Sequence, residues 1–92
     1  MELNDLLENV KDRETFFDFA NALLSDKEDE ARKEKESPTT YSDKGHNGWV
    51  NNNIEGFLDS AIAFTEDNSS WIDEPNLWKK FALFLYGGKI YE

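Results

Sequence analysis

The chain has 92 residues, a length that predicts a single domain with one modest core. It contains no cysteine, which excludes disulfides, thiolate catalysis and cysteine-based zinc sites. Twenty acidic residues against ten basic ones give a net charge of −10, which disfavours direct binding to nucleic acid or to an anionic membrane.

Two helices are predicted before residue 37. The apolar residues of the first have helical spacing, at Leu3, Leu6, Leu7 and Val10. Asp12 is placed to cap the second helix, and its apolar side carries Phe16, Phe19, Ala20, Leu23 and Leu24. Residues 25–36 are almost wholly charged, so we expect the second helix to continue into solvent and to fray toward Pro38. A partner-binding arm is the alternative for this charged extension.

A long irregular loop is predicted at about residues 37–53, where Pro, Gly, Asn and Ser are frequent. Asn52 and Glu55 have the spacing of a capping box at the start of a third helix. The apolar stripe of that helix consists of Ile54, Phe57, Leu58, Ala61, Ile62 and Thr65. Trp49 lies just before this helix, and we expect its ring to pack on Phe57 and fix the loop to the core. A contact with a binding partner is the alternative for Trp49.

The last third of the chain predicts an acidic loop followed by a final helix. Residues 66–76 form the loop, and Asn76 caps the helix. The apolar side of the helix carries Leu77, Trp78, Phe81, Ala82 and Leu85. Gly87 is expected to end the helix, after which Ile90 and Tyr91 fold back onto the core. The predicted fold is therefore all-α, a single domain over residues 1–92 with three to four helices.

The sequence shows no targeting or membrane-spanning segment. The residues at its beginning lack the basic and long apolar regions of a secretory signal. The longest apolar run, Phe81–Tyr86, is too short to cross a membrane. We expect a cytoplasmic protein without a membrane partner.

No arrangement of residues in the sequence indicates catalysis or a cofactor. The single histidine, His46, lies in the Gly- and Asn-rich loop with no nucleophile motif around it. The acidic runs that begin at Asp26 and Asp67 lack the glycine and the terminal glutamate of an EF-hand. We predict no catalytic residues, no metal site and no cofactor.

The third helix and the loop after it carry the acidic residues that we consider for partner binding. Glu55, Asp59 and Glu66 lie within about 40° of one another around a helix axis. Residues 37–74 hold seven acidic residues and one basic residue. The candidate surface consists of Glu55, Asp59, Glu66, Asp67, Trp71, Asp73 and Glu74, with Trp71 as an exposed aromatic anchor. A merely solvated border of the core is the alternative.

Three segments together resemble a family of small acidic bacterial proteins that carries only a domain-of-unknown-function label. They are "DRETFFDFANAL" at 12–23, "GWVNNNIEGFLDSAIAF" at 48–64 and "LWKKFALFLYGGKIYE" at 77–92. The shared pattern is an Arg-Glu-Thr-Phe helix start, a Gly-Trp-x-Asn join before a Phe-Leu helix, and a Trp-x-x-Phe-Ala helix ending in Ile-Tyr-Glu. The resemblance implies a bacterial, cytoplasmic, mostly helical protein. It implies no activity and no site residues.

Three functional hypotheses follow. The first is a non-enzymatic protein-binding module, with an immunity- or antitoxin-like inhibitor of a basic protein as one form of it. The second is a structural or regulatory subunit that self-associates through an aromatic face. The third, least favoured, is a small ligand-binding domain or enzyme that uses Tyr41 or His46 of the loop. The sequence does not fix the oligomeric state.

Overall fold

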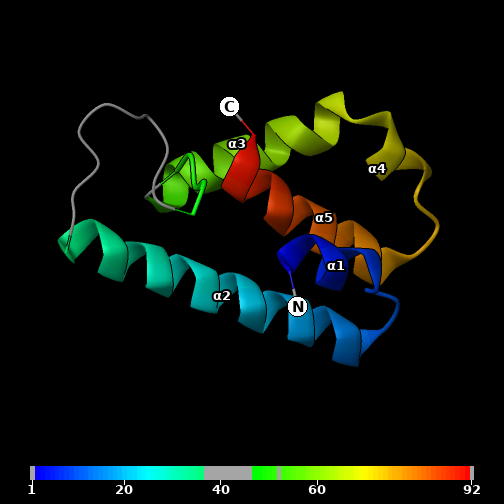
Figure 1. The fold of residues 1–92 in the computed structure, drawn as a ribbon. Helices are drawn as coiled ribbons and strands as arrows, with labels where there is room; N and C mark the ends of the chain where they lie inside the picture. The colour runs from blue at the N-terminus through cyan, green and yellow to red at the C-terminus, as the bar shows by residue number, and fades with distance from the viewer. Residues whose placement is uncertain (1, 37–46, 52, 92) are drawn as a thin grey trace.

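Five helices form in residues 2–36, 47–51 and 53–91, which are the residues that our computed structural model describes. The helices are α1 (Leu3–Glu8), α2 (Arg13–Glu36), α3 (Ile54–Asp67), α4 (Ser69–Asp73) and α5 (Leu77–Ile90). Figure 1 shows α5 between α2 and α3, with α1 lying across α2 and α5. The all-α fold is thereby confirmed. The acidic segment at residues 66–76 was predicted to be a loop, but part of it forms the one-turn helix α4.

Side-chain oxygens next to the helix starts accept the backbone N–H groups that a first turn leaves without partners. Asp12 Oδ1 accepts from Thr15 N at 2.9 Å at the start of α2, as predicted. Asn76 Oδ1 accepts from Lys79 N at 3.1 Å at the start of α5, also as predicted. The prediction for α3 was wrong by one position, since Asn53 is the cap and accepts from Gly56 N at 2.7 Å. Asn52 lies outside the described residues.

The core is built from the facing sides of α1, α2 and α5 together with two side chains outside the helices, Val10 and Trp49. Its buried residues are Leu7, Val10, Phe19, Leu23, Trp49 and Ala82. The ring of Trp49 keeps only 4% of its surface exposed and stacks on Phe57, with the ring centres 6.2 Å apart. The prediction that Trp49 packs on Phe57 and joins the core is therefore confirmed.

The predicted end of the last helix was wrong. Gly87 and Gly88 are buried inside α5, which continues to Ile90. A Cβ on Gly88 would lie 2.5 Å from the Phe57 ring, and one on Gly87 would lie 2.6 Å from the Phe64 ring. These glycines therefore allow α3 to approach α5 closely and do not turn the chain. Ile90 stays 39% exposed, so it does not fold back onto the core.

The apolar stripe predicted for α3 is also only partly buried. Ala61 and Thr65 are buried, whereas Ile54, Leu58 and Ile62 keep 77%, 44% and 46% of their surface exposed. The packing side of α3 is rotated toward Phe57 and Phe64, the rings that touch the two glycines of α5. One edge of the stripe is thus left uncovered.

The helical part of the predicted charged extension is confirmed, since α2 is a helix through Glu36. Its exposure was predicted wrongly, because Glu30 is fully buried. Residues 37–46, with Pro38, Tyr41 and His46, lie outside the described residues. None of the helices in the described part of the chain is long and apolar enough to cross a membrane.

Candidate functional site

Glu55, Asp59 and Glu66 form an acidic row along the exposed side of α3. All three side chains are exposed. The row spans about 16 Å at about 1.5 Å of rise per residue, on the side opposite Phe57 and Phe64. The sequence contains no Lys or Arg from residue 51 to residue 78, so neither α3 nor α4 contributes a positive charge. The acidic row thus presents three negative charges to solvent on one helix.

The other four predicted site residues lie beyond the acidic row, at or after the end of α3. Asp67 accepts a hydrogen bond from the Tyr91 hydroxyl, and this carboxylate raises the pKa of Tyr91. Asp73 is exposed at the end of α4. Glu74 is half-buried, and its Oε2 accepts from Asn76 N at 2.9 Å. Asp67 and Glu74 therefore have partners within the chain.

Trp71 differs from the exposed anchor that the sequence predicted. Its ring is half-buried, and Nε1 donates to the Lys80 carbonyl at 2.8 Å. The Lys80 ammonium lies 4.6 Å from the ring centre, a cation–π distance. Trp71 therefore fixes α4 to α5, and its amphipathic ring is largely occupied by that contact.

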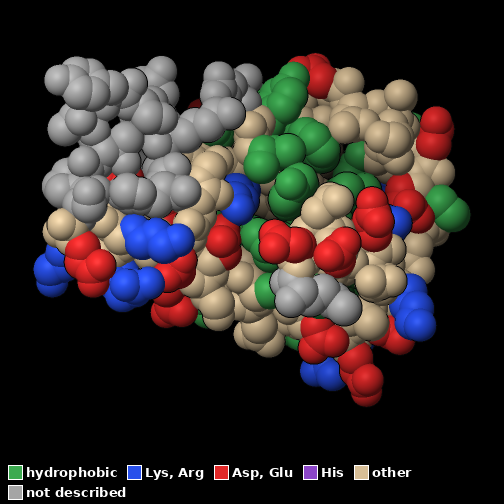
Figure 2. Space-filling view, viewed as in Figure 1, with side chains coloured by type: hydrophobic (Ala, Val, Ile, Leu, Met, Phe, Trp, Pro, Cys, Tyr) green, Lys and Arg blue, Asp and Glu red, His purple; other side chains and the backbone are tan. Residues whose placement is uncertain are grey.

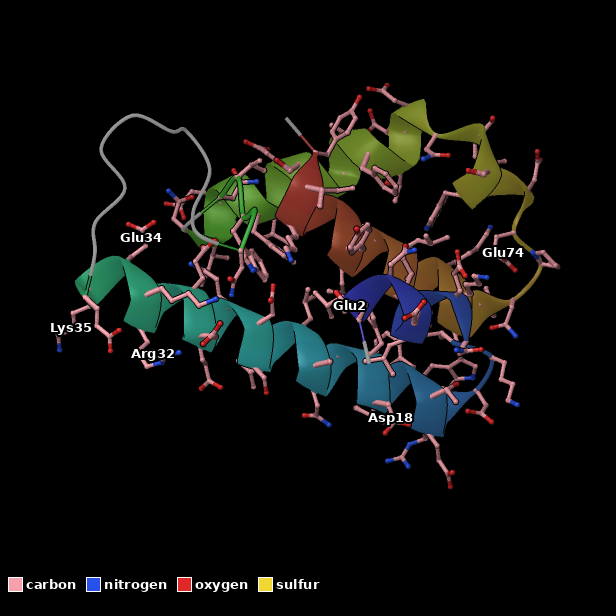
Figure 3. The ribbon with its side chains drawn as sticks, viewed as in Figure 1. Glu2, Asp18, Arg32, Glu34, Lys35 and Glu74 are labelled. Atoms are coloured by element: carbon pink, nitrogen blue, oxygen red, sulfur yellow. The ribbon has the colours of Figure 1, made fainter. Side chains whose placement is uncertain are left out.

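Basic side chains accompany the acidic ones at the end of α2, whereas α3 and α4 carry acidic side chains alone. Figure 3 shows Glu74 at the turn between α4 and α5, and Arg32 and Lys35 at the distant end of α2. Figure 2 shows basic and acidic side chains intermixed at that end of α2, and apolar side chains gathered where α3 meets α5. The structure therefore divides the seven predicted residues into the acidic row on α3 and four residues at or after the end of α3, Asp67, Trp71, Asp73 and Glu74.

A polar cluster that the sequence analysis missed holds residues 47–51 against α2. The buried Glu30 Oε1 accepts from the backbone N–H groups of Asn47 at 3.1 Å and Trp49 at 3.2 Å. Its Oε2 lies 3.3 Å from Lys27 Nζ. A fully buried carboxylate needs such partners, because burying an unpaired charge is costly. Glu30 is therefore an anchor for the segment that carries Trp49.

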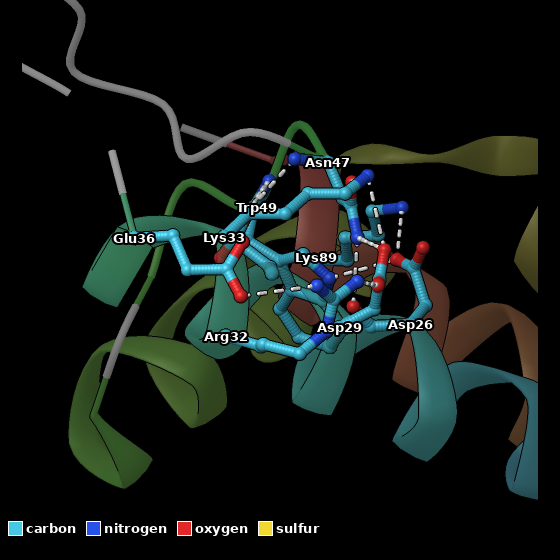
Figure 4. Close-up of polar contacts among 9 residues, drawn as sticks. Asp26, Asp29, Arg32, Lys33, Glu36, Asn47, Trp49 and Lys89 are labelled. Atoms are coloured by element: carbon cyan, nitrogen blue, oxygen red, sulfur yellow. Dashed lines mark hydrogen bonds and ion pairs between the residues drawn. The ribbon is translucent and has the colours of Figure 1, made fainter. Parts of the chain in front are cut away.

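Asp26 and Asp29 complete this polar cluster (Figure 4). Asp26 Oδ2 accepts from Trp49 Nε1 at 2.8 Å and from Lys89 Nζ at 2.6 Å. Asp29 pairs with Lys33 at 3.0 Å and accepts from Asn47 Nδ2 at 3.1 Å. Lys33, Asn47 and Arg32 together lower the pKa of Asp29 well below its usual range. The cluster thus joins three segments that are far apart in the sequence.

The sequence contains a signal for this cluster that periodicity alone could reveal. Phe19, Leu23, Asp26 and Glu30 follow one another at helical spacing along α2. The two acidic residues therefore continue the buried stripe where apolar residues stop. Beyond this stripe, Asp29 pairs with Lys33, and Arg32 contacts Asp29 and Glu36.

The polar cluster is suited to holding structure, since its carboxylates already have N–H or ammonium partners. Among the residues that the structure describes, no three His, Cys, Asp or Glu side chains are grouped to hold a metal ion. Comparison of the chain with protein families, with curated proteins and with solved structures finds no match. The resemblance to a family of small acidic bacterial proteins therefore stays a prediction.

Proposed function

We propose that this protein is a non-enzymatic binding module that takes a basic protein partner on the acidic row of α3. The observation that supports the proposal is the exposure of Glu55, Asp59 and Glu66 on one side of a helix without basic residues. An immunity- or antitoxin-like inhibitor of a basic protein, bacterial and cytoplasmic, is the specific form that we favour.

The physical basis is electrostatic complementarity. A surface of one charge steers an oppositely charged protein and raises its association rate, an effect that salt weakens. The acids of the polar cluster cannot contribute equally, because Asp26, Asp29 and Glu30 already bind positive or N–H groups. The acidic row therefore offers a partner's Lys and Arg more than the polar cluster does.

A pair of charge-reversal variants tests this proposal. The first carries Glu55→Lys, Asp59→Lys and Glu66→Lys. The matched control carries Asp5→Lys, Glu8→Lys and Asp18→Lys, which reverse three exposed acids on α1 and α2. Each immobilised protein captures partners from a lysate of the source cells at low and at high salt. We expect a captured basic protein that salt releases, that the control retains and that the α3 variant loses.

Two results would contradict the proposal. If no protein is captured in a salt-sensitive way, the proposal has no basis. If both variants lose the captured protein equally, only the net charge of the chain matters. The specific role of an inhibitor is tested by the neighbouring genes, where an adjacent toxin gene is expected. Purified toxin should lose activity when the protein is added in equal amount.

Self-association is a second candidate function, favoured by exposed aromatic rings. Phe17 and Phe81 keep 45% and 49% of their surface exposed, and both rings contact Phe16. Light scattering at high protein concentration tests this hypothesis, and a monomer at all concentrations would rule it out. The third hypothesis, a small ligand-binding domain or enzyme, depends on Tyr41 and His46 outside the described residues.

A further inference from the structure

An apolar groove of about 560 Å³ lies between α2, the first half of α3 and α5. Trp49 and Phe57, which stack on each other, line it together with Leu85 of α5. Its two walls carry Leu24 of α2 and Ile54 and Leu58 of α3. The groove therefore has aromatic and aliphatic surfaces from all three long helices.

The walls of the groove lack a covering element in the described part of the chain. Leu24, Ile54 and Leu58 keep 57%, 77% and 44% of their surface exposed. The short helix α1 covers a different side of α2, since Leu3 lines a depression with Ala22, nearly opposite Leu24 around the helix. Contiguous exposed apolar side chains of this kind are typical of binding surfaces.

The rim of the groove on the α3 side is acidic. Glu55 directly follows Ile54 and Asp59 directly follows Leu58, so each acid points about 100° away from a groove residue, toward solvent. The nearest basic side chain of the groove is Lys27, which pairs with Glu30 and lies 5.6 Å from the Trp49 ring centre. Charge at this rim therefore favours a cationic occupant.

The dimensions of the α3 wall match a helix as the occupant. Ile54 and Leu58 line the groove at i and i+4, and the exposed Ile62 continues this spacing one turn beyond the groove, so the three side chains extend over about 12 Å along the axis of α3. Apolar residues at i, i+3 or i+4, and i+7 of a helix cover nearly the same length. A second copy of this chain fits poorly, because each copy carries a net charge of −10.

We propose that the groove binds an amphipathic helix of the basic partner, with its apolar side on Leu24, Ile54 and Leu58 and its Lys or Arg residues against Glu55 and Asp59. This inference rests on the proposed function and adds a defined mode of recognition to it. The acidic row supplies attraction, and the groove supplies specificity by accepting only a helix whose apolar residues share one side.

Synthetic peptides test the groove directly. The probe is a fluorescein-labelled peptide of about 18 residues, long enough to form a helix, with Leu on one side and Lys on its flanks. One control peptide has the same composition in scrambled order, and a second has Glu in place of every Lys. Fluorescence anisotropy measures their affinity for the intact protein. We expect the probe to bind more tightly than either control peptide by at least about tenfold.

Matched variants locate the binding site. The groove variant carries Ile54→Ser and Leu58→Ser, and the control variant carries Ile72→Ser and Leu77→Ser, an equally exposed pair outside the groove. We expect the groove variant to lose at least about tenfold in affinity for the probe and the control variant to retain it. Circular dichroism and thermal unfolding confirm that both variants fold. If the groove variant is unfolded, the single substitution Ile54→Ser, at the most exposed wall residue, replaces it.

The outcomes separate this inference from the proposed function. Equal binding of the scrambled peptide, or unchanged binding of the probe by the groove variant, overturns the proposal that the groove binds an amphipathic helix. The salt-sensitive capture of a basic protein on the acidic row can still succeed in that case. No binding of the probe overturns the groove proposal as well. A dimer in sedimentation equilibrium that the groove variant dissociates also overturns it, because the occupant is then a second copy of the chain.

Discussion

Acidic side chains serve different purposes in α2 and α3, the two helices that carry most of them. In α2, Asp26 and Glu30 lie on the buried side and bind Trp49 and its neighbours. In α3, Glu55 and Asp59 lie on the exposed side, with no ion pair to any residue that the structure describes. The side of the helix, and not the density of charge, thus distinguishes a structural carboxylate from one that is free to meet a partner.

The largest expected effect comes from the side chain that the α2 acids hold. Trp49→Ala should lower the free energy of unfolding by about 3–5 kcal/mol, because it leaves a cavity in the core. The change also leaves Asp26 without the indole donor. Urea denaturation measures the effect. Trp71→Ala, at a half-buried ring, should cost clearly less, and an equal loss in both variants would contradict the distinction between them.

Glu30 tests the structural role of the α2 acids more directly. Glu30→Ala should cost about 2–3 kcal/mol of unfolding free energy, because two backbone N–H groups lose a charged acceptor. Glu28→Ala, at an exposed position of the same helix, should change stability by less than about 0.5 kcal/mol. Equal effects measured by chemical denaturation would mean that Glu30 is not an anchor.

The pH dependence of stability provides a third test, with a defined sign. The pKa of Asp29 is lowered in the folded protein, so its contribution to stability is present above about pH 4, near the unfolded pKa. That contribution is lost as the pH falls through the folded pKa. Denaturation midpoints measured between pH 6 and the acid limit should therefore decline less steeply in Asp29→Asn than in the natural chain. Identical pH profiles of the two proteins would show that the contacts of Asp29 do not stabilise the folded chain in solution.

The smallest expected effect concerns the acidic row on α3. The triple variant Glu55→Gln, Asp59→Asn and Glu66→Gln should have a free energy of unfolding within about 0.5 kcal/mol of the natural chain, since exposed substitutions rarely cost more. The same variant should weaken binding to a basic partner. A loss of stability comparable to that of Glu30→Ala would remove the contrast between the two helices.

Much of the fold follows from local patterns. Helical spacing of apolar residues located α1, α2, α3 and α5, and the Asp12 and Asn76 caps are local as well, because the accepting side chain and the N–H donor are three residues apart. The charged extension at 25–36 was correctly predicted as helical for the same reason. The position of Trp49 before an apolar helix was sufficient to predict its burial on Phe57.

Contacts between distant segments explain two of the predictions that were wrong, the end of the last helix and the exposure of Trp71. Gly87 and Gly88 look like a helix stop, but Phe57 and Phe64 need their small size for close packing of α3 on α5. Trp71 looks like an exposed anchor, but α5 supplies the carbonyl and the ammonium of Lys80. Both of these corrections involve a partner nine or more residues away, which a local pattern cannot identify.

Local patterns were sufficient to predict an all-α chain with an acidic surface, because helical periodicity, caps and charge are all local properties. Which acids are anchors and which are exposed depends on how α2, α3 and α5 pack, because packing determines burial. The same packing decided that Leu24, Ile54 and Leu58 border one groove. Side chains thirty residues apart can form a common surface only after the helices that carry them have packed against each other.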